Sequence, residues 1–127
     1  MRSKWMTSLV AAALLAAPAA RAADAPKKTP QLVEKGKTSF ATNCASCHGP
    51  KGEGDGVAAA ALKPRPANLL TASFKGGAKP AQVFETLGKG VPGTAMVAFK
   101  HLPEEERWAL AYYVTDLRAK APRTAKK

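Results

Sequence analysis

Apolar residues recur with a helical period shortly after residue 30 of the chain. Those of this first stretch are Leu32, Val33, Gly36 and Phe40. They fall on one face of a helix that Thr29 can cap, with Pro30 suited to the first helical position and Asn43 at the end. A glycine inside a helix costs about 1 kcal/mol relative to alanine. We therefore expect another element to approach the helix closely at Gly36.

A second helical period appears in the last quarter of the chain. Its inward positions are Ala109, Leu110, Tyr113 and Leu117, at intervals of three and four residues. Pro103 suits the first position of this helix, and the glutamates at 104–106 complement the positive end of its dipole. The three glutamates therefore indicate a helix start and not a catalytic carboxylate cluster. The helix should end before Pro122.

The middle of the chain predicts one short helix between irregular segments. Residues 80–87 suit a helix that ends at Gly88, and its inward side chains are Val83, Phe84 and Leu87. The glycine-dense stretch 49–56 and the proline-rich stretch 63–69 predict loops, separated by a helical turn within 57–62. The expected elements are three main helices and loops, with no alternating β/α pattern.

The first 22 residues resemble a secretory signal peptide. Two basic residues stand near the start, an apolar run follows at 9–17, and Ala20-Arg21-Ala22 is a small-x-small cleavage sequence. We expect cleavage after Ala22, with Ala23 as the nearest alternative. The apolar run is too short for a permanent membrane span. The mature protein should therefore be exported, and we place it in the periplasm.

Removal of the leader leaves a basic chain with two polar ends. Loss of Arg2, Lys4 and Arg21 lowers the formal net charge of +11 by three, to +8. We expect 23–30 to be a flexible mature N-terminus and 120–127 to be a basic C-terminal tail. A surface of this sign attracts acidic partners and speeds their encounter. Nucleic acid is not expected as a partner of an exported protein whose lysines are scattered.

Both cysteines and one of the two histidines belong to the pentapeptide Cys44-Ala45-Ser46-Cys47-His48. Two thiols at this spacing can each add to a vinyl group of one porphyrin, and the adjoining imidazole can bind its iron. A thiol oxidoreductase would place the motif in an alternating β/α pattern, which is absent. Zinc would need further ligands, and only His101 remains. Haem attachment is therefore the favoured interpretation.

With this motif, the sequence resembles a class I c-type cytochrome, a small monohaem electron carrier, over roughly 31–119. The resemblance implies the all-α cytochrome c fold, with three main helices and irregular loops around one haem c. It implies covalent attachment through Cys44 and Cys47, with His48 as a ligand of the iron. The helix-crossing residues of the family correspond to Gly36, Phe40 and Tyr113.

Met96 is the candidate for the second axial ligand. It is the only methionine of the expected mature chain, and by residue type alone it would be core filling. The loop that ends in Met96, Gly-Val-Pro-Gly-Thr-Ala-Met, is similar to the axial-methionine loop of the family. Val97 stands where many members have proline. The resemblance nevertheless implies ligation by Met96 ahead of His101, which we expect to be a partly exposed residue near the last helix.

The resemblance also implies a second interaction of the haem histidine. In the family a proline carbonyl usually accepts the Nδ1 proton of that histidine, and Pro64 and Pro66 are both candidates here. Arg65 would contact either a haem propionate or solvent.

The function implied is electron transfer without a substrate of the protein's own. The protein would be a free shuttle or the haem subunit of a dehydrogenase, and its partners would be larger redox enzymes with acidic docking surfaces. The alternative is a haem enzyme or gas-binding protein with an open sixth coordination site. Against it, His101 is the only spare histidine for a distal acid–base group. A thiol–disulfide oxidoreductase comes third.

Overall fold

The structure, a computed structural model, describes residues 25–122. That range contains helices and no strands, in the order α1 (Pro30–Asn43), α2 (Ala45–His48), η2 (Ala59–Ala61), α3 (Pro80–Lys89) and α4 (Glu104–Lys120). The all-α architecture is therefore as predicted. The expected signal peptide at 1–22, the first two residues of the mature chain and most of the basic tail lie outside the described residues. None of the described helices is both long and apolar enough to span a membrane.

The start and end of α1 are those predicted from the sequence. The backbone N–H of Leu32 donates to the hydroxyl of Thr29 at 3.1 Å, and Pro30 is the first helical residue. This hydroxyl satisfies one of the backbone donors that the first helical turn leaves without a partner. The side of α1 that faces the core consists of Leu32, Gly36, Ser39 and Phe40, all buried.

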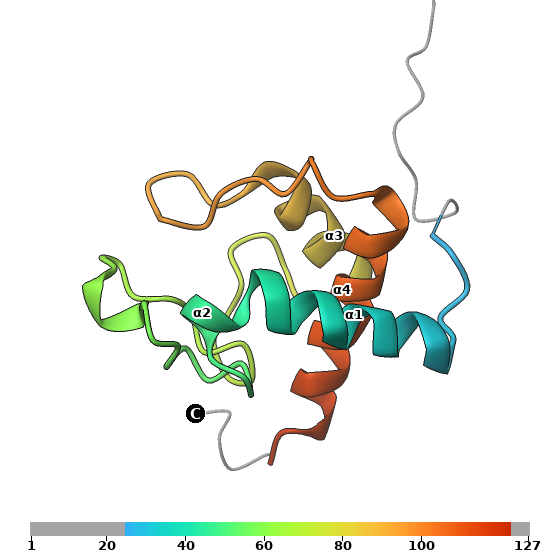
Figure 1. Ribbon diagram of the computed structural model, residues 1–127, viewed down its shortest axis with the longest axis horizontal. Helices are drawn as coiled ribbons and strands as arrows, with labels where there is room; N and C mark the ends of the chain where they lie inside the picture. The colour runs from blue at the N-terminus through green and yellow to red at the C-terminus, as the bar shows by residue number, and fades with distance from the viewer. Residues whose placement is uncertain (1–24, 123–127) are drawn as a thin grey trace, which may run out of the picture.

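α1 and α4 cross in close contact, as Figure 1 shows. A Cβ atom on Gly36 would lie only 2.1 Å from the carbonyl oxygen of Ala109, so no larger residue fits at the crossing. Next to it, the rings of Phe40 and Tyr113 pack with their centroids 5.3 Å apart and their planes tilted by 58°. The predicted crossing of these two helices is confirmed.

α3 is longer than predicted. It continues through Gly88 to Lys89 and stops at Gly90, whose φ of 70° favours glycine. The prediction that Gly88 ends the helix was wrong. Gly88 is buried inside the last turn, where an added Cβ would lie 3.0 Å from a guanidinium nitrogen of Arg107. Because Gly88 has no side chain, Arg107 of α4 can approach α3 closely at this position.

α4 begins at Glu104, so Pro103 caps the helix and does not occupy its first position. Its buried residues are Trp108, Ala109, Leu110, Ala111, Tyr112 and Val114. Tyr113 and Leu117, which we expected to point inward, are partly buried. Trp108 stacks on Phe84 of α3 with ring centroids 4.2 Å apart. α4 therefore packs against both other long helices, and it ends before Pro122 as predicted.

Two of the glutamates in the first turn of α4 also connect it to α1. The hydroxyl of Ser39, which is buried, donates to the carboxylate of Glu106 at 2.6 Å. Lys35 forms an ion pair with Glu105 at 2.9 Å. The glutamates lie in the first turn of α4 as predicted, although the helix begins one residue later than Pro103, and two of them also form contacts between the two helices.

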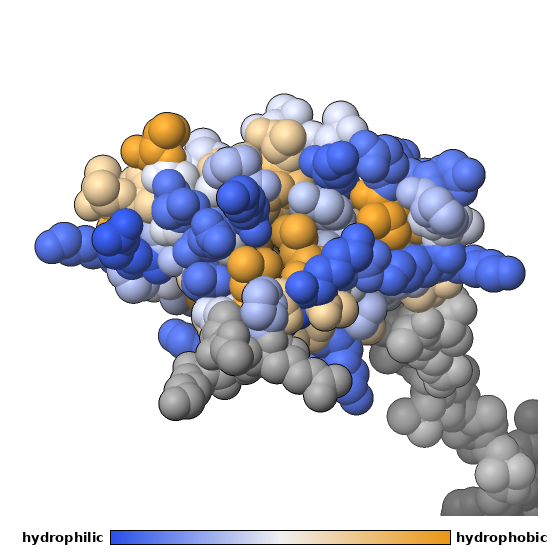
Figure 2. All heavy atoms as spheres, turned by 90° about the horizontal axis from the view of Figure 1, so that it is seen from below, coloured by the Kyte–Doolittle hydropathy of each residue, from blue (hydrophilic) through white to orange (hydrophobic). Residues whose placement is uncertain are grey.

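The long helices and the irregular segments occupy different sides of the molecule. In Figure 1, α2, the segment after it and the loop between α3 and α4 lie to the left of the crossing of α1 and α4. Within the described residues, α2 packs mainly on α1 and η2. On the face seen in Figure 2, apolar side chains remain visible between hydrophilic ones.

Candidate functional site

The Cys-x-x-Cys-His sequence forms a short helix directly after α1. The backbone N–H of Cys44 still donates to Phe40, and the carbonyl of Cys44 accepts from the N–H groups of Cys47 and His48 at 3.2 and 2.9 Å. Both cysteines are free thiols, Cys44 buried and Cys47 partly buried. One short turn at the end of α1 therefore presents two thiols and an imidazole together.

The thiol of Cys44 has an environment unlike that of a redox-active cysteine. Burial, and to a lesser extent the neighbouring Cys47, raises the pKa of Cys44 to about 11. The thiol is therefore protonated at neutral pH. A nucleophilic cysteine in a dithiol oxidoreductase needs a lowered pKa. The burial of Cys44 thus argues against thiol–disulfide chemistry at this motif.

The imidazole of His48 is held by a backbone carbonyl. Its Nδ1 lies 3.0 Å from the carbonyl oxygen of Ala67, and because a carbonyl can only accept, Nδ1 carries the proton. Burial lowers the pKa of His48, and the hydrogen bond to Ala67 opposes this in part. The ring is therefore neutral at pH 7, with the lone pair on Nε2. This is the form of histidine that binds a metal.

The prediction that Pro64 or Pro66 accepts this hydrogen bond was wrong, because the acceptor is Ala67. The carbonyl of Pro66 faces Gly54, where an added Cβ would lie 2.7 Å from its oxygen. Successive carbonyls of an extended segment point in opposite directions. The carbonyl that follows Pro66 is consequently the one that reaches His48.

The glycine-dense segment after His48 folds back onto α2. The N–H groups of Gly54, Gly56 and Ala58 donate to carbonyls of the motif, at 2.7 Å for His48, 3.1 Å for Cys47 and 2.9 Å for Ser46. At Gly56 an added Cβ would lie 2.2 Å from the carbonyl oxygen of Ser46. These contacts give hydrogen-bond partners to the carbonyl groups at the end of the short helix, and the glycine-dense stretch is a loop, as predicted. Arg65, farther along, is exposed.

Met96 lies in a loop that is braced by its own hydrogen bonds. The N–H of Val91 donates to the carbonyl of Met96 at 2.9 Å, and the N–H of Met96 donates to the hydroxyl of Thr94 at 3.1 Å. At Gly90 an added Cβ would lie 2.7 Å from the carbonyl oxygen of Met96. Met96 is partly buried and packs at the edge of the core. In Figure 1 this loop extends to the same side of the molecule as α2.

His101 is exposed, as expected for a residue outside the site, and its ring packs against Phe99 with centroids 5.7 Å apart. Among the described residues, no three His, Cys, Asp or Glu side chains gather where they could hold a metal ion.

The family model for cytochrome c matches residues 33–118. The match includes the Cys-x-x-Cys-His turn and the loop with Met96. The chain belongs to the cytochrome c family. A cytochrome c domain implies haem-based electron transfer, and the all-helical fold described above is the fold of this family.

The cytochrome c domain is also similar to a solved structure. It matches a chain of the reducing HAO-like protein complex of Kuenenia stuttgartiensis with a TM-score of 0.69 and 32% sequence identity. The match covers 79% of this chain and 50% of the other, so this cytochrome c spans about half the length of that chain. A comparison with curated proteins finds no match.

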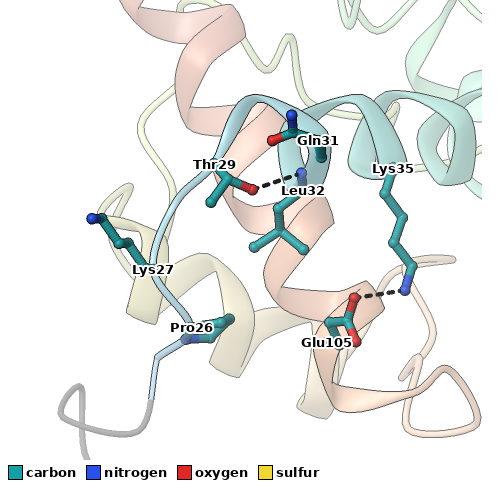
Figure 3. A pocket seen from close by; sticks show the side chains of 7 residues that line it. All are labelled: Pro26, Lys27, Thr29, Gln31, Leu32, Lys35 and Glu105. Carbon is teal, nitrogen blue, oxygen red and sulfur yellow. Dashed lines mark hydrogen bonds and ion pairs between the residues drawn. The ribbon is translucent and has the colours of Figure 1, made fainter.

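The residues present fit a covalently bound haem c. The two thiols are free, and Nε2 of His48 is left available because Nδ1 is bonded to Ala67. Both thiols come from one turn, as attachment to a single porphyrin requires. A surface pocket of about 360 Å³ lies elsewhere, at the start of α1, and its polar contacts belong to the helix cap and the ion pair with Glu105 (Figure 3).

Two residues near the site were not identified from the sequence. Ala67 contributes only its backbone carbonyl, for which residue type carries no signal. Arg118, in the last turns of α4, donates to two carbonyl oxygens close to Ala67. An arginine near the end of a helix is ordinarily a solvated residue that complements the helix dipole. The position of Arg118 in the sequence therefore gave no sign of its contacts near the site.

Proposed function

We propose that this cytochrome c carries single electrons, with one haem c attached to Cys44 and Cys47 and with His48 and Met96 as the axial ligands. Each thiol would add across one vinyl group, its sulfur to one carbon and its hydrogen to the other, so that attachment consumes no oxidant. The haem supplies the iron, whose change between ferric and ferrous takes up or releases one electron.

The observation that carries this proposal is the arrangement of His48 beside two free thiols. The bond from Nδ1 to Ala67 orients the ring and leaves Nε2 as the only ring nitrogen available to the iron. A histidine held in this way keeps its position in both oxidation states. His48 therefore satisfies two requirements of a carrier, a fixed ligand and little rearrangement on electron transfer.

Met96 supports electron transfer over gas binding or catalysis. A thioether stabilises ferrous iron better than a second nitrogen ligand does, and it raises the potential. The loop holds Met96 through Thr94, Val91 and the close contact at Gly90, which favours a permanent ligand over a mobile one. With both axial positions filled, no site would remain for peroxide or a diatomic gas.

The surface near the site supports docking of an acidic redox partner. The described ion pairs of lysines involve Lys28, Lys35, Lys37 and Lys89. The cations of the segment after α2, Lys51, Lys63 and Arg65, are exposed and make no ion pair with a described residue. Val57 in this segment is 96% exposed and Val97 in the methionine loop is 61% exposed.

These features suit a small, transient interface with a charged rim. We propose a larger redox protein as partner, and the related chain in an HAO-like protein complex supports that class. The leader-like sequence at 1–22 would place the encounter in the periplasm.

The ligand set is tested by changing Met96 to histidine. Haem that stays with the denatured polypeptide establishes the thioether bonds in the unmutated protein. Met96→His should then lower the midpoint potential, because a nitrogen ligand favours ferric iron. His101→Gln is the control and should leave the potential unchanged. If Met96→His left both the midpoint potential and the spin state unchanged, Met96 would not be a ligand of the iron and the proposed ligand set would be wrong.

A further inference from the structure

The carbonyl that holds His48 belongs to a segment without helix or strand. Ala67 is exposed and lies in the proline-rich stretch, directly before the turn at 68–72. The N–H of Leu69 donates to the carbonyl of Gly52 at 2.7 Å, but Gly52 is itself part of a loop. The position of Ala67 against His48 therefore depends on what fastens this segment to a rigid element.

The turn that follows Ala67 is stabilised by hydrogen bonds between its own residues. The side-chain oxygen of Asn68 accepts from the N–H of Leu70 at 2.9 Å, and the carbonyl of Asn68 accepts from the N–H of Ala72 at 2.9 Å. Ala67 directly precedes this turn, so an attachment of the turn's carbonyls to a rigid element restricts the position of Ala67.

Arg118 provides that attachment from α4. One terminal nitrogen of its guanidinium, Nη1, donates to the carbonyl of Leu69 at 2.7 Å and to the carbonyl of Ala72 at 2.9 Å. The guanidinium also lies over the ring of Phe74, 4.4 Å from its centroid. Arg118 is partly buried, where bonds from a charged donor are stronger than at an open surface. Three contacts thus join one side chain of a long helix to the segment that holds His48.

We propose that Arg118 is a positioning residue that sets the hydrogen bond between Ala67 and His48 and, through it, the donor strength of His48 toward iron. This inference rests on the proposed role of His48 as an iron ligand. A firm bond at Nδ1 makes the imidazole a stronger donor, and a stronger donor favours ferric iron. Removing the contacts of Arg118 should therefore weaken the hydrogen bond between His48 and Ala67 and raise the midpoint potential of the haem.

The test uses the mature haem-containing protein and three variants. Arg118→Gln removes the guanidinium that donates to the carbonyls of Leu69 and Ala72. Arg118→Lys keeps a charged donor but cannot stack on Phe74 in the same way. Lys120→Gln, on the same helix, is exposed and removes the same charge without touching the segment. The readouts are the exchange rate of the His48 Nδ1 proton, followed by NMR in the reduced protein, and the midpoint potential.

We expect Arg118→Gln to speed exchange of the Nδ1 proton about tenfold, which is the loss of about one hydrogen bond, and to raise the potential. Arg118→Lys should fall between this variant and the unmutated protein, and Lys120→Gln should match the unmutated protein. If Arg118→Gln is not recovered with haem, the exchange rate and the potential of Arg118→Lys decide the same question.

A second control separates positioning from loss of stability. Tyr112→Phe removes the hydrogen bond that the Tyr112 hydroxyl donates to the carbonyl of Pro26 at 2.7 Å, and neither residue makes a described hydrogen bond to the segment around Ala67. It should lower the free energy of unfolding without changing proton exchange at His48 or the potential. Equal changes in Tyr112→Phe and Arg118→Gln would mean that Arg118 acts only on stability, and the inference would be wrong.

The proposed function is checked on the unmutated protein before the variants. A reduced protein whose His48 does not bind iron would contradict the proposed function, and the inference with it. A protein with His48 bound, in which Arg118→Gln changes neither exchange nor potential, would contradict the inference alone.

Discussion

Among single residues, backbone groups position the two proposed iron ligands. The ring of His48 is oriented by the carbonyl of Ala67, and Met96 is held through its own N–H and carbonyl. A backbone group can be moved by a substitution that leaves every functional side chain in place. Glycines next to the site are therefore the most informative positions to change.

Gly90→Ala should disturb the loop that presents Met96. The residue has a φ of 70°, and the added Cβ would lie 2.7 Å from the carbonyl oxygen of Met96. We expect a loss of about 3 kcal/mol in the free energy of unfolding, which combines backbone strain with the steric contact. Denaturant unfolding followed by haem absorbance measures this loss.

Gly93→Ala is a matched control in the same loop. Its φ of 77° causes similar backbone strain, but no atom lies within 4 Å of the added Cβ. We expect this variant to lose about 1 kcal/mol. Equal losses in Gly90→Ala and Gly93→Ala would show that the contact with Met96 has no energetic importance.

At the scale of elements, α4 is the helix that organises the fold. It crosses α1 at Gly36, stacks on α3 through Trp108 and reaches the segment near Ala67 through Arg118. The contacts at its two ends serve different purposes. The N-terminal half closes the helical core, and the C-terminal half supports the candidate site.

Gly36→Ala should separate α1 from α4. The added Cβ would lie 2.1 Å from the backbone oxygen of Ala109, which cannot move without shifting α4. We expect a loss of at least about 3 kcal/mol in the free energy of unfolding, despite the better helix propensity of alanine. Thr42→Ala, at an exposed position of α1, should change it by less than about 0.5 kcal/mol. A Gly36→Ala protein as stable as Thr42→Ala would contradict the crossing.

The sequence predicted the long helices well because each carries its own apolar period. The end of α3 was missed because Gly88 is an efficient helix stop by residue type, and only its packing against Arg107 explains why the helix continues. The Cys-x-x-Cys-His motif could be predicted to attach haem because its chemistry depends on side chains, which the sequence gives directly. The role of Ala67 could not be predicted from the sequence, because every residue has a backbone carbonyl. Only the folded conformation of the loop determines which carbonyl reaches His48.

On the scale of the whole molecule, one side is built from packed helices and the other from loops. The buried core joins α1, α3 and α4. In Figure 1, the segment after α2 and the loop between α3 and α4 lie on the same side of the crossing of α1 and α4 as α2. A haem bound on this side would give the loops an apolar surface to pack against, so folding and haem attachment should be coupled.

Removal of both thiols should therefore leave the chain largely disordered. In Cys44→Ala/Cys47→Ala the haem would have no covalent attachment, and the loops would lose the interior they fold around. Far-ultraviolet circular dichroism of the haem-free variant should show much less helix than the haem-containing protein. A cooperatively folded variant with full helix content and no haem would contradict this coupling.

The central claim is that His48 and Met96 close both axial positions of the iron. The most direct measurement is the reaction of carbon monoxide with the reduced, unmutated protein, followed by absorbance. We predict a low-spin haem that does not bind carbon monoxide, and a Met96→Ala variant that binds it readily. Rapid binding by the unmutated protein would show that the sixth position is open and would contradict the assignment as an electron carrier.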